Sequence, residues 1–269
     1  MDPQHDLRQL EQDAASWWHI ARRNLLREVV AQALRGKREA RILDMGGKAE
    51  LAFEQPALWV VNQHNSLDSA AFAQLHGRRH LVCSSIDELA FASNCFDVVL
   101  AGDFLQLIAD DRSALRELLR VLKDGGLLCL TVPAYSFLWG DDDERRGHCR
   151  RYRASELRGK LTTAGFEVQR ASYFVATAFL PLAMARMTRN ILHTAAVRDN
   201  HYPRHSRVAS AAMVTLLDAE RQLMHHINLP FGTRLVCWAR KPAMVAITVP
   251  AWERQWVASP RLTWSGSES

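Results

Sequence analysis

The sequence predicts a doubly wound α/β fold, in which helices cover both faces of a largely parallel sheet. Short, continuous apolar runs match buried strands, and the segments between them place apolar residues at helical spacing. Strands covered on both faces are continuously apolar, whereas half-exposed strands alternate. Strands that alternate with helices along a chain form this kind of sheet. A chain of 269 residues is long enough for one such core.

Seven apolar runs are predicted to be strands. Gly46-Gly47 follows the first run and Pro133 closes the fifth, and both are residues that end strands. The predicted strands are 41–45, 58–62, 80–83, 97–101, 127–132, 166–171 and 233–239.

Helices are predicted before and between these strands. A long helix is expected at 7–35, where Trp18, Leu25 and Val29 share one face and Gly36 ends the pattern. Another follows the fourth strand, and a third covers 155–164. The segment before the last strand is too long for a simple loop and has helical character. The expected organisation is an N-terminal helical segment (1–37), a domain (38–242) with a helical insertion at about 173–229, and a C-terminal tail (243–269).

Composition limits the function classes. The net charge is +5 and the basic residues are scattered, so a nucleic-acid partner is not expected. The five cysteines are far apart and form no CxxC pair, so a reduced, cytoplasmic protein is expected. The polar N-terminus does not resemble a signal peptide, and no apolar stretch reaches the roughly 18 residues that a membrane span requires. The histidines of the insertion lack carboxylates or thiols at metal spacing, so no metal is predicted.

The order of several motifs resembles class I S-adenosylmethionine (SAM) methyltransferases of the type 11 branch. Phe96-Asp97-Val98-Val99 is followed by the run LRELLRVLKDGG at 115–126, as in that family. Asp143-Glu144, Gly147-His148 and Arg150-Arg151-Tyr152 then match its "DE..GH.RRY" members. The resemblance covers most of 15–242 and implies a seven-stranded, Rossmann-like methyltransferase sheet. Such members often accompany pathways that modify lipids, sugars or polyketide-like products.

The resemblance implies a SAM site at the ends of the first strands, where this sequence departs from the family. The family pattern D-x-G-x-G-x-G begins here at Asp44, and Lys48 and Glu50 replace its later glycines. Asn62 stands for the acidic residue expected at the end of the second strand, and Ser85 for the Asp after the third. Gln106-Leu107 replaces a Glu-His pair. The implied cofactor-binding residues are Asp44, Gly46, Gly47, Asn62 and Ser85.

Two functions of different classes follow from this degenerate motif. The first is SAM-dependent methylation of a small or lipid-like acceptor. The alternative is a catalytically inactive pseudo-methyltransferase that serves as a binding or partner subunit, because four departures fall in one pocket. A repurposed pocket with other chemistry is a third, weaker hypothesis.

The acceptor side is predicted near the cluster after the fifth strand. His148 is the candidate catalytic base, since its ordinary pKa is near neutrality. Trp139, Arg151 and Tyr152 are the candidate substrate-binding residues. The structural alternative is that Arg151 pairs with Asp143 or Glu144 to fix the loop, with Tyr152 packed beneath it.

Three further interpretations concern loops and surfaces. Asp103 is expected to be a solvated loop residue rather than part of the cleft. The apolar segment 173–192 either covers a hydrophobic acceptor, rests on a membrane surface, or packs as a lid helix on its neighbour. A partner protein or a second copy of the chain is compatible with the sequence.

Overall fold

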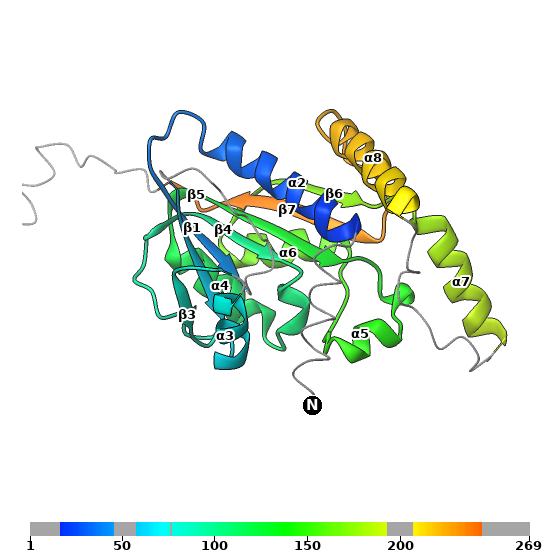
Figure 1. The fold of residues 1–269 in the computed structure, drawn as a ribbon, viewed down its shortest axis with the longest axis horizontal. Coiled ribbons are helices and arrows are strands. Elements are labelled where there is room, and N and C mark those ends of the chain that lie inside the picture. Colours follow the sequence, from blue (N-terminus) through cyan, green and yellow to red (C-terminus); the bar gives the residue numbers. More distant parts are fainter. Residues whose placement is uncertain (1–16, 46–57, 76, 193–206, 244–269) are drawn as a thin grey trace, which may run out of the picture.

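The computed structural model describes residues 17–45, 58–75, 77–192 and 207–243. Within them lies one seven-stranded sheet with the strand order β3-β2-β1-β4-β5-β7-β6, in which β7 alone runs antiparallel to its neighbours (Figure 1). The strands are β1 (Ala40–Met45), β2 (Leu58–His64), β3 (Leu81–Cys83), β4 (Phe96–Gly102), β5 (Leu122–Pro133), β6 (Glu167–Phe174) and β7 (Arg234–Arg240). The predicted fold class is therefore confirmed.

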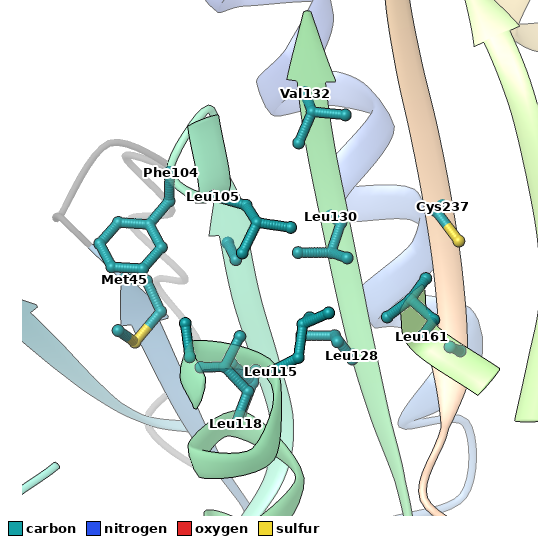
Figure 2. Close-up of a cluster of buried hydrophobic side chains, with 14 of the residues drawn as sticks. Met45, Phe104, Leu105, Leu115, Leu118, Leu128, Leu130, Val132, Leu161 and Cys237 are labelled. Carbon is teal, nitrogen blue, oxygen red and sulfur yellow. The ribbon is translucent and has the colours of Figure 1, made fainter. Parts of the chain in front are cut away.

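Helices cover both faces of the sheet. On one face α2 (Trp17–Ala33) packs against α8 (Arg207–Leu223), and on the other α4 (Asp111–Val121) packs against α6 (Ala154–Ala164) (Figure 1). Two buried apolar clusters fill these layers. Figure 2 shows the second layer, where side chains of the sheet meet those of α4 and α6: Met45, Leu128, Leu130 and Cys237 from strands and Leu115, Leu118 and Leu161 from helices.

Local sequence explains where the helices begin and end. The Asp110 carboxylate accepts hydrogen bonds from the backbone N–H groups of Arg112 and Ser113, both at 3.1 Å, and so caps α4. At the end of α6, Gly165 adopts a φ of 102°, a left-handed conformation that glycine reaches without a steric penalty.

The segment between β6 and β7 is helical, as predicted. It contains α7 (Phe179–Leu192) and α8. The buried Glu220 of α8 accepts hydrogen bonds from the backbone N–H groups of Ala176 and Thr177, at 3.0 and 2.9 Å, and thereby fixes the start of α7. Among the described helices, none is both long and apolar enough to cross a membrane.

Three predicted strand boundaries were wrong by more than one residue, and one of them is the end of β6, which lies at Phe174 and not at 171. β5 begins at Leu122, five residues before the predicted start, and includes the glycine turn at Gly125-Gly126. β2 continues past Asn62 to His64, because polar residues there still pair with β3. Polarity alone therefore did not mark the end of β2, and this error affects the site.

Candidate functional site

The first three strands end together at one edge of the sheet. Asp44 is buried on β1 and lies opposite Asn62 of β2 in the parallel register. In open α/β sheets, the crevice outside the carboxyl ends of the strands is where ligands bind. Gly46 and Gly47, as well as Lys48 and Glu50, lie outside the described residues.

Asn62 does not occupy the end of its strand, contrary to the prediction. Its side chain is 5% exposed, and its amide donates to the backbone carbonyl of Arg79 at 3.0 Å. The residue at the carboxyl end of β2 is His64, two positions further on. Ser85 lies after β3 as predicted, but it is exposed and its hydroxyl accepts the N–H of Asp87 at 3.3 Å.

Several polar atoms at the ends of β2 and β3 are buried and have no hydrogen-bond partner among the residues that the structure describes. The Gln63 amide donates to the Ser84 carbonyl at 2.7 Å and to the Asn65 side chain at 2.8 Å, while its Oε1 has no hydrogen-bond partner among the described residues. The same holds for Oγ of Ser84. Because a buried polar atom without a partner costs about 1–3 kcal/mol, these atoms indicate a place prepared for a polar ligand.

His64 adds a third such atom. The residue is 4% exposed, Nδ1 lies 3.1 Å from the Ser69 hydroxyl, and Nε2 is buried with no partner in the described part of the chain. Burial lowers the pKa of His64, and the nearby Arg78 guanidinium lowers it further. The ring is therefore neutral near pH 7.

A second polar cluster lies after β5, where the sequence predicted the acceptor side. Asp143, on α5 (Asp141–Arg145), accepts a hydrogen bond from His148 Nδ1 at 2.8 Å. It also accepts from Arg151 Nε and Nη2, at 3.0 and 2.8 Å, and from the backbone N–H of Gly140 at 2.9 Å. Burial opposes ionisation of Asp143, but the hydrogen bonds from His148 and Arg151 outweigh it and lower its pKa to about 2. The carboxylate is thus ionised and saturated with donors.

This cluster bears on three predicted site residues. His148 is mostly buried, with its Nδ1 held by a carboxylate, an arrangement that leaves Nε2 for proton transfer. Arg151 is held by Asp143 and by the carbonyl of Ala134 at 3.1 Å, which is the structural role weighed from the sequence. Trp139 is half-buried, and its indole N–H lies 3.4 Å from a Glu144 carboxylate oxygen.

Tyr152, a predicted substrate-binding residue, lies beneath the loop. Its side chain is fully buried, and its hydroxyl donates to Asp111 at 3.1 Å. Asp111 also pairs with Arg150 at 3.1 Å and with Lys160 at 2.8 Å. Tyr152 therefore packs beneath the loop and ties it to the start of α4.

Asp103 is a largely buried ionic centre, with its side chain 12% exposed, rather than a solvated loop residue, so that prediction was wrong. It follows β4 with a φ of 49°, and its carboxylate pairs with Arg22 at 2.8 Å and Arg234 at 3.3 Å. Trp18 donates its indole N–H to Asp103 at 2.9 Å. Burial raises the pKa of Asp103, but the two guanidinium groups and Trp18 lower it more, so the net shift is downward. The pKa of His19 falls to about 2, through burial and then Arg22.

An aromatic cluster adjoins the end of β5. Tyr135 stacks on Tyr173 with ring centroids 4.9 Å apart, and Phe179 of α7 lies 5.5 Å from Tyr135. Phe137 and Phe231 are 44% and 41% exposed at its rim. Tyr135 has a φ of 56°, so the backbone is strained where it presents this ring.

Sequence reasoning missed Gln63, His64 and Asp103 as site residues. The first two fell beyond the predicted end of β2, although their type, polar residues directly after an apolar run, is the signal that marks a carboxyl edge. Asp103 also follows an apolar run, but its ion pairs could not be predicted, because Arg22 and Arg234 are distant in sequence.

Comparisons with known proteins agree with this architecture. Residues 45–130 match the model of a family described as a methyltransferase domain. The chain is similar to the [4+2]-cyclase SpnF, with a TM-score of 0.51 and 24% identity over 81% of this chain and 80% of that one. It is similar to a complex of the Haloferax volcanii methyltransferase activator Trm112 with a methyltransferase (TM-score 0.51, 16% identity, 79% and 88% covered). A Haemonchus contortus phosphoethanolamine N-methyltransferase 2 bound to SAM gives a TM-score of 0.50 and 18% identity over 80% and 51%. No curated protein sequence matches the chain.

Proposed function

We propose that this chain, which has the fold of the class I SAM-dependent methyltransferases, binds SAM and methylates a small or lipid-like acceptor. SAM, when bound, supplies a methyl group activated by the sulfonium. The chain's own residues then hold the two reactants, exclude water and accept a proton. Since the methyl group is already activated, alignment accounts for most of the catalytic effect.

The observation that carries this proposal is the set of unpartnered polar atoms at the ends of β2 and β3. Gln63 Oε1 and Ser84 Oγ lie where a parallel sheet binds ligands, and their burial is costly unless a ligand pairs with them. A nucleoside carries several hydroxyl and amine donors that suit such acceptors. Asp44, Gly46 and Gly47 would hold the amino-acid end of SAM, as the family resemblance implies.

His148 is the proposed base for the acceptor. Asp143 is ionised and can only accept hydrogen bonds, so the proton of neutral His148 is on Nδ1. Nε2 then carries the free lone pair that takes a proton from the attacking group. Gly140, Arg151 and the backbone N–H of His148, which donates to the Asp143 carbonyl at 2.9 Å, fix the position of this pair.

The aromatic cluster supports an apolar acceptor. Phe137 and Phe231 expose ring surface next to the end of β5, and both contact Phe179 of α7. Leu180 and Met184 of α7 are also 62% and 66% exposed. Contiguous exposed apolar surface often marks a ligand-binding or interaction site. Arg151, engaged by Asp143, is not proposed as an anion receptor.

A second candidate is a non-catalytic subunit that binds a partner protein. The sequence departures Lys48 and Glu50 favour it, and one structural neighbour is a methyltransferase complexed with an activator protein. Another similar structure is that of the [4+2]-cyclase SpnF, so other chemistry is compatible with this fold. A cytoplasmic location, with or without contact to a membrane surface, stays a prediction.

Calorimetric titration of the protein with SAM and with S-adenosylhomocysteine (SAH) tests the first candidate. Binding with a dissociation constant below about 1 mM supports it, and the absence of heat and of a thermal shift at millimolar ligand would overturn it. Gly46→Leu is expected to abolish binding. Gly159→Leu is the matched control, because a Cβ at Gly159 on α6 meets nothing within 4 Å.

A further inference from the structure

A pocket lies on the face of the sheet that α2 and α8 cover (Figure 1). Its volume is about 240 Å³, close to the lower end of the range of about 300–1,000 Å³ that small-molecule sites span. Part of its wall is apolar and comes from Leu25 and Val29 of α2, Met224 directly after α8, and Trp238 of β7. The space therefore suits a small organic molecule with an apolar body.

This pocket is separate from the candidate site. The first turns of α2 lie at the strand ends, where Arg22 pairs with Asp103 at 2.8 Å. The α2 residues that line the pocket begin at Leu25 and extend to Gln32, which lies about 15 Å beyond Arg22 at 1.5 Å per residue. The lining includes none of the polar groups at the ends of β2 and β3 and no residue of the Asp143 cluster.

Arg221 of α8 is a guanidinium held at the wall of this pocket. It pairs with Glu28 of α2, and its Nε donates to Asp218 at 3.2 Å. Its side chain is 18% exposed, and its Nη2 group donates to no residue in the described part of the chain. The guanidinium therefore keeps two N–H donors for a ligand, in a position that its carboxylate partners already fix.

Arg170 of β6 is the second guanidinium at this wall. It donates to the backbone carbonyl groups of Met224 and His225, just after α8, and it lies 5.7 Å from the ring centre of Trp238. Within the described ranges no carboxylate pairs with it, so its partners there are uncharged. The half-buried Trp238 likewise donates its indole N–H to no described residue, and this N–H is a further donor for a ligand.

The charges at the wall are unequal. Glu28 is the one carboxylate among the described residues that line the pocket, and both Arg221 and His225 contact it, His225 through Nε2 at 2.5 Å. Asp218 does not line the pocket, and its side chain is 37% exposed, so water screens its charge. The charge of Arg170 is therefore not balanced at the wall, and a positive wall beside apolar side chains favours an anion.

We infer that this pocket binds a small organic anion, with a carboxylate on a short apolar or aromatic body. The carboxylate lies between Arg170 and Arg221, whose guanidinium groups match it in charge and in hydrogen-bond geometry. The body lies against Trp238 and the buried side chains of Leu25 and Val29. Such a ligand joins α2, α8 and the sheet, and it occupies a second site that is independent of the proposed function.

The experiment is a fluorine NMR titration of the whole protein at low ionic strength, where charges are least screened. The ligands are para-fluorobenzoate and, as an uncharged molecule of similar size, para-fluorobenzyl alcohol. The benzoate is expected to bind with a dissociation constant of about 1 mM, at least about fivefold more tightly than the alcohol.

Variants of Gln169 test where the anion binds. Gln169 lines the pocket and is exposed, so its side chain can be changed without breaking the ion pairs. Gln169→Glu is expected to weaken binding of the benzoate about two- to fivefold, and Gln169→Lys to strengthen it by a similar factor, because each places a charge beside the carboxylate. Arg170→Gln is expected to weaken it about tenfold, from the loss of a charged hydrogen bond. Gln74→Glu and Gln74→Lys, at an exposed position of α3 (Leu67–Leu75) near the opposite edge of the sheet, are the matched controls and should bind as the wild type does.

The inference is overturned if the wild type does not bind the benzoate at about 20 mM, or if it binds the alcohol equally well. Equal affinities of wild type, Gln169→Glu and Gln169→Lys would place the anion elsewhere, and so would displacement of the benzoate by SAH. Opposite shifts from the two Gln169 variants support the pocket, since a loss of folding cannot strengthen binding. Circular dichroism melting of Arg170→Gln identifies any loss of folding in that variant. If SAH does not bind at all, the proposed function fails and this second site is unaffected.

Discussion

Two polar regions at the same edge of the sheet differ in how well their hydrogen bonds are satisfied. Around Asp143, the carboxylate accepts from His148, Arg151 and Gly140. At the ends of β2 and β3, atoms of Gln63 and Ser84 are buried with no partner in the described chain. Sequence motifs predicted residues of the first region, whereas for the second they predicted the strand ends but not Gln63, His64 or Ser84.

This contrast distinguishes structural from ligand-binding polarity. A saturated network gains little from a ligand, because its groups already have partners; its role is to fix geometry. An unsaturated buried atom makes the folded chain less stable until a ligand pairs with it. Therefore Asp143 and Arg151 position His148, whereas Gln63, His64 and Ser84 are the groups expected to touch a ligand.

The largest expected effect comes from Asp143→Asn. The amide has one acceptor oxygen for the donors of His148, Arg151 and Gly140, and its NH₂ group faces a guanidinium. The free energy of unfolding, measured by denaturant titration, is expected to fall by about 3 kcal/mol, as for other buried pairs that lose one partner. Asp142→Asn is the matched control on the same helix: Asp142 forms only half-exposed pairs with Arg145 and Arg146, and a change below about 0.5 kcal/mol is expected.

The pH dependence of the stability difference between wild type and Asp143→Asn is a separate check. Asp143 has a pKa of about 2 in the folded protein, below its ordinary value of 3.8, so its stabilisation is complete above about pH 4 and is lost as pH falls toward 2. The stability gap between wild type and Asp143→Asn is thus expected to be constant from pH 7 to about pH 4 and to narrow below it. A gap that widens on acidification would contradict the ionised, donor-saturated carboxylate.

A smaller effect is expected at Ser172 of β6. Its buried hydroxyl donates to the Tyr173 carbonyl and accepts the N–H of Leu229, both at 2.9 Å. Ser172→Ala leaves that N–H without its acceptor, and the free energy of unfolding is expected to fall by about 1–3 kcal/mol. Thermal melting at two protein concentrations checks the value and excludes an effect through association.

The fold was predictable because its signals are local. Continuous apolar runs, the capping Asp110 and the terminating Gly165 lie next to the elements that they define, so the sheet, the N-terminal helix and the helical insertion all followed from the sequence. The site was less predictable. Hydrogen bonds such as Trp18 to Asp103 join residues 85 positions apart, and no pattern along the chain reports them. The end of β2 was misplaced because strand pairing with β3, rather than polarity, decides it.

No loss of stability is expected at Ser84, and this substitution decides whether the comparison holds. Its Oγ is buried without a partner in the described chain, so Ser84→Ala removes a desolvated hydroxyl and breaks no hydrogen bond. Because the buried hydroxyl without a partner costs stability, the free energy of unfolding should not fall and should rise by up to about 1–3 kcal/mol, while affinity for SAH falls about three- to tenfold. The same substitution at Ser172 provides the reference, since the two serines differ in whether the hydroxyl is satisfied. If Ser84→Ala costs as much stability as Ser172→Ala, its hydroxyl already has a partner in the free protein, and an unsatisfied atom no longer identifies the ligand-binding strand ends. If stability is kept and affinity is also unchanged, the ligand pairs with Gln63 or His64 and not with β3.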